Sequence, residues 1–392
     1  MNSKIITILT IGLFCLSCSE EEIFNEDYYS CNTLNGVNYL DHPKATLYQS
    51  ILDQNQRLDV VGAVLLVEDP DGLWVGSSGY SDLASNIEMQ TCNTFLIASI
   101  SKTYTATAIY RYIDQGLLSI NDTISQYLPS SINDDVANTQ IATIGHLLSH
   151  RSGIPDFYTD KFDLDRLNAE QSWDKYEVLE YAYGLDSEFT PDSSYSYSNT
   201  NYLLLSIILE RISGKSLEQI YNEELFVPLN LSTAYYSEDQ LLPNGVVKGY
   251  ADIYGNGNFV HSDFLYTEEI GIGGDGGIAS NATDLAFFLK TLALGNVISE
   301  QSFNQMTNWF DLPNDAQNDD PLIIKNGYGF ERVESDYGFG LGHTGGIDGF
   351  NTFAYYFPDT DVTYVLLLNS VTAGGTDAPE NIFRQTLNTI FN

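Results

Sequence analysis

Ser99-Ile100-Ser101-Lys102 is the stretch from which the rest of this chain is best interpreted. It opens a segment, 101–116, whose apolar positions recur at helical spacing and which a glycine is placed to end. A serine three residues before a lysine on a helix puts a hydroxyl and an amine on one face, close enough for proton transfer. The same spacing occurs at Ser172 and Lys175, so the motif alone indicates little.

Two other short motifs supply the chemistry that the first one lacks. They are Tyr197-Ser198-Asn199 and His343-Thr344-Gly345. At a helix N-terminus, Ser99 meets backbone N–H groups and a helix dipole that favour developing negative charge. Lys102 can take the serine proton only if burial or a neighbouring charge lowers its pKa. An ordinary capping serine and a surface lysine are the alternative interpretation of this pair.

Hydrophobic patterning predicts strands near both ends of the chain and helices between them. This order favours one mixed domain assembled from both ends of the chain, with a mostly helical domain inserted. The predicted elements are a helix over 43–58, a hairpin of 60–67 and 73–80 buried on both faces, helices over 144–149 and 202–212, strands over 351–357 and 362–369, and a closing helix over 379–391.

The same pattern divides the chain into a leader, an acidic tether and one large domain. We assign 1–17 to a signal peptide, 18–42 to the tether and 43–392 to the domain. Within the domain, 43–100 and 266–392 form the α/β part, and 101–265 forms the helical part.

Composition excludes several classes of partner. The formal net charge is −37, so nucleic acids and anionic membrane surfaces are poor partners. None of the five histidines lies in a metal-binding motif; His146 and His150 have an i, i+4 spacing but no accompanying acidic ligand. We therefore expect no metal. We also expect no cofactor, a small-molecule substrate (a small peptide, a β-lactam or an ester) and a monomer.

The N-terminus has the features of an export signal. Lys4 precedes an apolar run over 5–16, which is short for a membrane span, and Leu16-Ser17-Cys18 resembles a bacterial lipoprotein box. Cys18 would be the lipidated residue, and an acidic stretch follows it. We expect an outer-membrane lipoprotein of the cell envelope, periplasmic or surface-exposed, held to the membrane only by its lipid; simple secretion is the alternative.

Two further cysteines remain after Cys18. Cys31 and Cys92 could form a disulfide in an oxidising compartment, which would tie the N-terminal tether to the strand before Ser99. Two separate buried thiols are an equally acceptable interpretation.

A longer set of motifs, in order and in register from about residue 45 to the C-terminus, resembles the serine β-lactamase-fold hydrolases. This group contains class C β-lactamases, exported D-alanyl-D-alanine carboxypeptidases and related esterases. The matching stretches are Phe95–Thr103, Asp114–Leu118, Tyr127–Pro129, His146–Ile154, Tyr195–Tyr202, Pro228–Leu231 and Gly342–Gly349. The resemblance implies an α+β fold of the β-lactamase/transpeptidase-like type, in which an antiparallel sheet is flanked by helices and a mostly helical domain is inserted. It also implies a serine nucleophile.

The resemblance also implies a role for each motif residue. Tyr197 matches the family tyrosine that relays the proton, and Asn199, in an extended loop, would bind the substrate amide or Lys102. His343, neutral or partly charged, would assist proton transfer through Tyr197, and its charge would change near pH 6 to 7. Class C β-lactamases usually carry lysine at this position and several esterases tryptophan, whereas some exported carboxypeptidases carry histidine. The backbone N–H groups of Ser99 and Gly346 would form the oxyanion hole.

The remaining residues of the third motif would bind substrate. Thr344 and Gly345 lie on the strand expected to line the cleft, and the glycine would let the substrate backbone approach closely. Gly346 stands where carboxypeptidases of this type carry a hydroxyl that helps to hold the substrate carboxylate. Arg332, a few residues upstream, could replace that group or could be a surface charge.

The combined motifs most resemble a D-Ala-D-Ala carboxypeptidase that forms an acyl-enzyme on Ser99. A class C-like β-lactamase and a small-ester hydrolase share this mechanism and are the alternatives within the family. A non-catalytic peptidoglycan- or penicillin-binding receptor is the alternative of another class. A receptor would have no need for four catalytic groups together, namely Ser99, Lys102, Tyr197 and His343.

Overall fold

The structure, a computed structural model, describes residues 41–55, 60–166, 173–236, 245–262, 273–312, 323–335, 338–372 and 378–391. The predicted signal peptide and nearly all of the tether, with Cys18 and Cys31, lie outside these residues.

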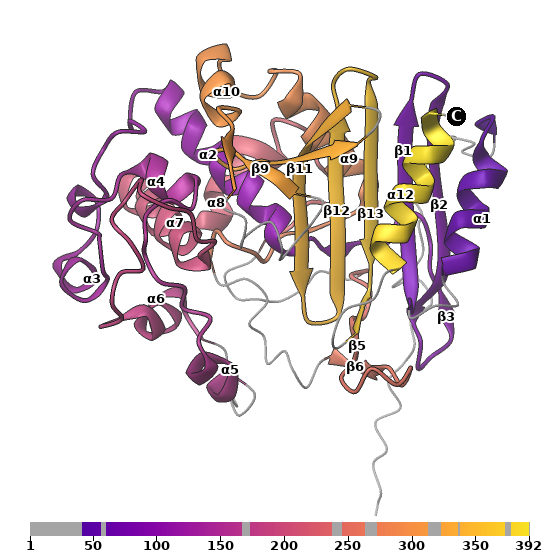
Figure 1. Cartoon of the computed structure of the whole chain (residues 1–392), viewed down its shortest axis with the longest axis horizontal. Helices are drawn as coiled ribbons and strands as arrows, with labels where there is room; N and C mark the ends of the chain where they lie inside the picture. Colours follow the sequence, from indigo (N-terminus) through magenta and orange to yellow (C-terminus); the bar gives the residue numbers. More distant parts are fainter. Residues whose placement is uncertain are drawn as a thin grey trace, which may run out of the picture.

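A nine-stranded antiparallel sheet is the largest element, in the order β3-β2-β1-β13-β12-β11-β10-β9-β8 (Figure 1). Its strands are β1 Gly62–Asp69, β2 Gly72–Asp82, β3 Ile87–Glu88, β8 Phe310–Asp311, β9 Ile323–Asn326, β10 Glu331–Ser335, β11 Gly338–Ile347, β12 Phe350–Phe357 and β13 Val362–Leu368.

The two ends of the chain meet inside this sheet. β1 pairs with β13 from Ala63 opposite Leu368 to Glu68 opposite Thr363. Both strands are almost wholly buried because helices cover both faces, and this explains their continuous apolar sequences. Strands from the two ends of the chain therefore lie side by side in one sheet.

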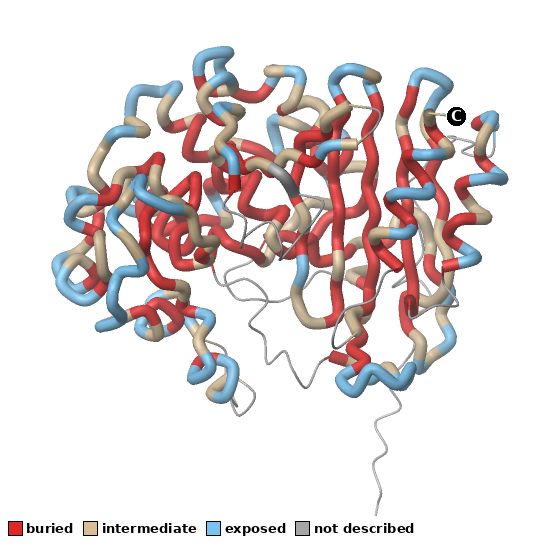
Figure 2. The backbone as a smooth tube through the Cα atoms, in the orientation of Figure 1, coloured by how far each residue is buried: buried red, intermediate tan, exposed pale blue. Residues whose placement is uncertain are grey.

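Different helices cover the two faces of the sheet (Figure 1). The helices α1 (Ala45–Asn55) and α12 (Ala378–Phe391) pack on one face, against alternate strand residues such as Leu65. The neighbouring Leu66 points to the other face, where α9 (Ala282–Ala293) and the helical lobe pack. Figure 2 shows the central strands as buried along most of their length.

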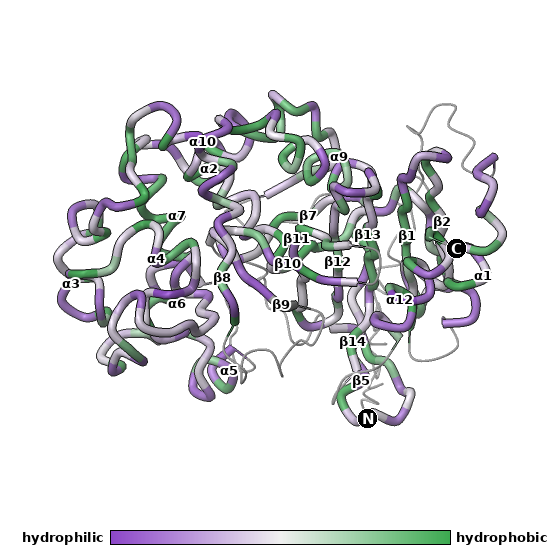
Figure 3. Tube along the Cα trace, turned by 45° about the horizontal axis from the view of Figure 1, so that its top comes forward, coloured by the Kyte–Doolittle hydropathy of each residue, from purple (hydrophilic) through white to green (hydrophobic). Residues whose placement is uncertain are grey.

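The helical lobe lies beside the β11 side of the sheet, opposite the side of α1 (Figure 1). Figure 3 shows hydrophobic stretches along β1 and β13 and hydrophilic ones in the outer turns of the lobe. Its helices are α2 Ser101–Asp114, α3 Ser130–Asp135, α4 Ile144–Leu148, α5 Asp160–Arg166, α6 Lys175–Leu179, α7 Asn199–Ser213, α8 Leu217–Tyr221 and α10 Glu300–Met306, with short 3-10 or π turns at Ala98–Ile100, Ile124–Gln126, Glu180–Ala182 and Asn222–Phe226.

Two small sheets connect the lobe with the large sheet. β14 (Ser370–Thr372) pairs with β5 (Tyr250–Asp252), and β5 pairs with β6 (Val260–His261). The sequence assigned β5 and β6 to the helical part, but they pack with the C-terminal strand β14. β4 (Phe95–Leu96) pairs with β7 (Ala279–Ser280). This pairing brings the segment just before Ser99 next to the segment just after the glycine-rich turn Gly273–Gly277.

Most predicted elements are confirmed. The helices near residues 45, 144 and 202, the hairpin β1–β2, the strands β12 and β13 and the closing helix all form. The prediction of a hairpin buried on both faces holds for β1, whereas β2 is partly exposed between Ser77 and Tyr80.

Candidate active site

Ser99 lies on a strained turn between β4 and α2. It is the middle residue of the 3-10 turn Ala98–Ile100, and no side chain caps the start of that turn or of α2. The residue before it, Ala98, has φ 48°, a left-handed conformation that costs a residue with a side chain about 1–3 kcal/mol. The surrounding packing therefore has to hold this turn in place.

Gly345 on β11 provides part of that packing. A Cβ atom at this position would lie 2.4 Å from the Ile97 carbonyl oxygen and 2.3 Å from Thr352 Oγ1. The Thr352 hydroxyl donates a hydrogen bond of 3.1 Å to the same Ile97 carbonyl. Gly345 thus makes room for the serine-bearing turn, and it is not among the residues that line the pocket. The approach of a substrate backbone to this glycine stays a prediction.

Lys102 is fully buried directly beneath the serine. Its Nζ lies 3.0 Å from Ser99 Oγ, 2.7 Å from Asn199 Oδ1 and 2.8 Å from the Asp275 carbonyl oxygen. A neutral amine satisfies this geometry by donating to the two carbonyl-type oxygens and accepting from the serine hydroxyl. Burial lowers the pKa of Lys102 to about 8, against the opposing effect of nearby carboxylates, so the amine can act as a base near neutrality.

Asn199 is the first residue of α7 rather than part of an extended loop, which corrects the prediction for its setting. Its amide oxygen accepts from Lys102, while its backbone N–H and its Nδ2 donate to Asp156 Oδ2 at 3.1 and 2.9 Å. Asp156 therefore fixes the orientation of the amide and, with it, the position of the lysine amine.

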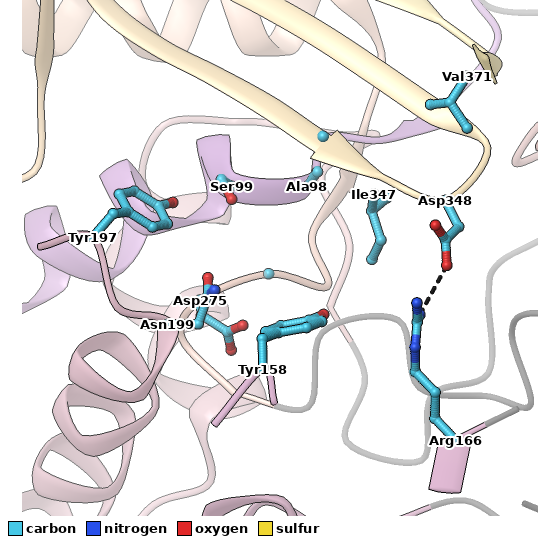
Figure 4. A pocket seen from close by; sticks show the side chains of 12 residues that line it. Ala98, Ser99, Tyr158, Arg166, Tyr197, Asn199, Asp275, Ile347, Asp348 and Val371 are labelled. Atoms are coloured by element: carbon cyan, nitrogen blue, oxygen red, sulfur yellow. Dashed lines mark ion pairs between the residues drawn. The ribbon is translucent and has the colours of Figure 1, made fainter. Parts of the chain in front are cut away.

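Tyr197 lines the pocket on the side of Ser99 opposite the Arg166 and Asp348 side chains, with its hydroxyl pointing toward Ser99 (Figure 4). The Lys102 ammonium lies 5.0 Å from the centre of its ring. Burial raises the pKa of Tyr197 well above its usual value, with a smaller opposing effect from the hydrogen bond to Ser99. Tyr197 is therefore a neutral phenol that can relay a proton, and Lys102, with the lower pKa, is the group available as a base near neutral pH.

His343 is buried on the same face of the sheet as Lys102 but does not line the pocket. Burial lowers its pKa to about 3, helped by the positive charge of Lys102, although the Glu331 carboxylate lies 3.5 Å from Nδ1. The ring is thus a neutral imidazole at ordinary pH. The predicted change of charge near pH 6 to 7 is wrong because it assumed an accessible histidine.

Thr344 faces away from the pocket. Its backbone N–H and its hydroxyl are 2.7 and 3.2 Å from Glu331 Oε2, which also accepts from the Tyr355 hydroxyl on the far face of the sheet. The Thr344 hydroxyl is therefore engaged by Glu331, and a role of this residue in binding substrate stays a prediction. Successive residues of a strand point to opposite faces, so only one of His343 and Thr344 could face the serine.

Glu331 and His150 are site residues that the sequence interpretation missed. Glu331 is buried on β10 and holds the third motif through the bonds just described. His150 has φ 54° and is stacked on the Tyr197 ring, with ring centres 4.2 Å apart. Its Nδ1 accepts a hydrogen bond of 3.1 Å from the Ser198 N–H, which fixes the segment that carries the phenol.

A pocket of about 460 Å³ opens directly onto Ser99 (Figure 4). An ion pair of 2.8 Å between Arg166 and Asp348 stands at its far side. Ser99 and Gly346 both line the pocket, so both predicted oxyanion-hole residues are in place; the use of their N–H groups stays a prediction. The lining residues are Ala98, Ser99, Tyr158, Arg166, Tyr197, Asn199, Asp275, Gly276, Gly346, Ile347, Asp348 and Val371.

Arg332 is not part of this pocket. It is paired with Leu341 in the β10–β11 register, five residues before Gly346, which corresponds to about 17 Å along a strand. Its guanidinium lies over the Phe339 ring at 4.1 Å and bonds Glu334 at 3.1 Å. The prediction that it holds a substrate carboxylate is therefore not supported, and the arginine on the pocket wall is Arg166.

The described residues contain no group of three or more histidine, cysteine or acidic side chains that could hold a metal ion. Cys92 is disulfide-bonded. Since Cys31 lies outside the described residues, its pairing with Cys92 stays a prediction.

A nucleophilic hydroxyl, a buried amine and a neutral phenol around one pocket define a serine hydrolase. The chain belongs to the Beta-lactamase family, whose family model matches residues 49–387.

Known proteins agree with this assignment. The chain is 29% identical to penicillin-binding protein 4* of Bacillus subtilis over 83% of this chain and 70% of that protein. It is 27% identical to a putative D-alanyl-D-alanine carboxypeptidase of Escherichia coli over 62% of this chain and 57% of the relative, so it spans little more than half of that protein. The crystal structure of D-amino acid amidase from Ochrobactrum anthropi superposes with a TM-score of 0.79 at 22% identity, covering 88% of this chain and 99% of that one, which confirms the fold.

The described part of the chain contains no helix with the length and apolar character needed to cross a membrane.

The pKa of Lys102 predicts the pH dependence of the reaction. Because only the neutral amine accepts the Ser99 proton, kcat/KM should rise about tenfold per pH unit below about 8 and level off above it. Since the pKa of His343 is about 3, no second step is expected at pH 6 to 7. The measurement is kcat/KM from pH 5 to 9.5 with a non-ionising ester. A step near pH 6.5 that disappears in His343→Asn would contradict this assignment.

Proposed function

We propose that this protein cleaves amide bonds of D-amino-acid peptides through an acyl-enzyme on Ser99, most like a D-Ala-D-Ala carboxypeptidase. The observation that carries the proposal is the 3.0 Å contact between Lys102 Nζ and Ser99 Oγ beside a pocket, with the phenol of Tyr197 on the other side. The names of the carboxypeptidase and penicillin-binding relatives support the class of substrate.

The proposed reaction has two steps. In the first, Ser99 Oγ attacks the carbonyl carbon, its proton passes to Lys102, and the C–N bond breaks as the leaving nitrogen takes a proton through Tyr197. In the second, water attacks the resulting ester, returns a proton to Ser99 and releases the acid. The Ser99 and Gly346 N–H groups would stabilise the oxyanion in both steps, an effect typically worth about 3 kcal/mol for each donor.

The same machinery would serve a class C-like β-lactamase or a small-ester hydrolase. A receptor that has lost turnover is less consistent with the structure, because a buried lysine with a lowered pKa is costly to keep and contributes nothing to binding alone. We further propose a monomer in the cell envelope, with a lipid on Cys18 as its only membrane attachment and no nucleic acid partner.

Mass spectrometry and a substrate panel test the proposal. The purified mature protein should gain one penicillin or phosphonate adduct on Ser99, and Ser99→Ala should gain none. Turnover should be fastest on a D-Ala-D-Ala peptide, compared with a chromogenic cephalosporin and an aryl ester. Absence of any adduct would favour the receptor, and a faster cephalosporin or ester would favour the corresponding alternative.

A further inference from the structure

Asp275 is a pocket residue for which the proposed mechanism has no use. It lies in the glycine-rich turn Gly273–Gly277, next to β7. A Cβ atom at Gly274 would lie 2.7 Å from Thr105 on α2 and 2.8 Å from the Tyr202 carbonyl on α7. The turn is therefore held between α2, which carries Lys102, and α7, which begins with Asn199, and this packing fixes the position of Asp275 relative to both.

The Asp275 carboxyl group is buried yet faces the pocket. The residue is only 8% exposed, lines the pocket, and lies across from Ser99 beside the Tyr158 ring (Figure 4). Within the described part of the chain, no other residue donates a hydrogen bond to this carboxylate; its carbonyl oxygen, by contrast, accepts from Lys102. A buried carboxylate without such donors is costly unless a cation faces it.

Among the described residues, no cationic side chain forms an ion pair with the Asp275 carboxyl group. Arg166 lines the same pocket but is already paired with Asp348 at 2.8 Å and with Asp163 at 3.0 Å. Burial raises the pKa of the Asp275 carboxyl group, and within the described part of the chain the positive charge of Lys102 opposes this rise and favours the ionised carboxylate. Acylation requires a neutral Lys102, however, and at that moment the carboxylate loses its counter-charge. A cation on the substrate would replace it.

We propose that Asp275 binds the α-ammonium group of the acyl part of the substrate. The Asp275 backbone carbonyl oxygen and Ser99 Oγ both contact the amine of Lys102, at 2.8 and 3.0 Å, and both residues line the pocket. In an aminoacyl group the α-nitrogen is two bonds from the carbonyl carbon, so a carbonyl placed at Ser99 brings the ammonium near this carboxylate. The inference rests on the proposed function and narrows its substrates to amides and short peptides of D-amino acids with an unblocked amino terminus.

A pair of substrates that differ only at the amine tests the proposal. The substrates are D-alanine p-nitroanilide and N-acetyl-D-alanine p-nitroanilide, and the readout is the ratio of their kcat/KM values. The intact protein should favour the free amine by about 10- to 100-fold, the usual strength of a charge-assisted hydrogen bond. Asp275→Asn should bring the ratio to within a few-fold of one, and Asp348→Asn, which removes the other pocket carboxylate, should preserve it.

The ratio separates recognition from a general disturbance of the site. A change in Lys102 or in folding lowers both values together and leaves the ratio unchanged. A ratio near one in the intact protein, or one preserved in Asp275→Asn, overturns the inference while acyl-enzyme formation on Ser99 still supports the proposed function. If Ser99 forms no adduct and neither substrate is cleaved, the proposed function fails and this inference fails with it.

Discussion

A Lys102→Ala variant is expected to acylate Ser99 about 100 to 10,000 times more slowly than the intact protein. The 3.0 Å contact makes Lys102 the nearest base to the serine hydroxyl, and the phenol of Tyr197 is too weak an acid to replace it at neutral pH. The measurement is the rate of penicillin or phosphonate adduct formation, followed by intact-protein mass spectrometry. Lys102→Met, which fills more of the space left by the lysine stem, should show the same loss.

The chain offers a matched control for this substitution. Lys175 also follows a serine by three residues, but it bonds Glu210 at 2.5 Å in the helical lobe and lies outside the pocket. Lys175→Ala should therefore acylate at the normal rate. Melting temperatures of all three variants show whether they fold. Near-normal acylation in a folded Lys102 variant would refute the role of this lysine as the base.

Local sequence patterns were sufficient to identify the residues around the nucleophile. Ser99 and Lys102 are three residues apart, so helical geometry alone brings them together. Tyr197 and Asn199 lie in one short motif, and the structure places both at Lys102. The strands β1 and β13 could be predicted because both are buried on both faces and so have unbroken apolar sequences.

Contacts between segments that are distant in the chain determine the positions of Glu331, Arg332 and Arg166, and the sequence alone could not show these contacts. Glu331 precedes Thr344 by 13 residues and holds it only because β10 and β11 pair in one register. The same register moves Arg332 away from the pocket, while α5 brings Arg166 to it. Burial is also invisible in a motif, and for this reason the sequence predicted a change in the charge of His343 near pH 6 to 7, whereas burial lowers its pKa to about 3.

Substitution by alanine is expected to destabilise the protein much more at Gly345 than at Gly346, although the two glycines are adjacent in the third motif. A Cβ atom at Gly345 would collide with the Ile97 carbonyl oxygen and Thr352 Oγ1, whereas one at Gly346 meets nothing within 4 Å. Overpacking of this kind costs about 1–3 kcal/mol, and an open surface position costs about 0.5 kcal/mol or less. Gly345→Ala should therefore be the less stable of the two by urea unfolding.

Gly345→Ala should also slow the acylation of Ser99, since the rigid carbonyl of Ile97 belongs to the segment that leads into the strained turn at Ala98. Moving this turn by even part of an ångström lengthens the contact between Ser99 and Lys102, on which proton transfer depends. The urea midpoints are comparable only if both variants unfold with the same denaturant slope. Equal stability of the two variants, with normal acylation in Gly345→Ala, would show that β11 does not hold the nucleophile in place.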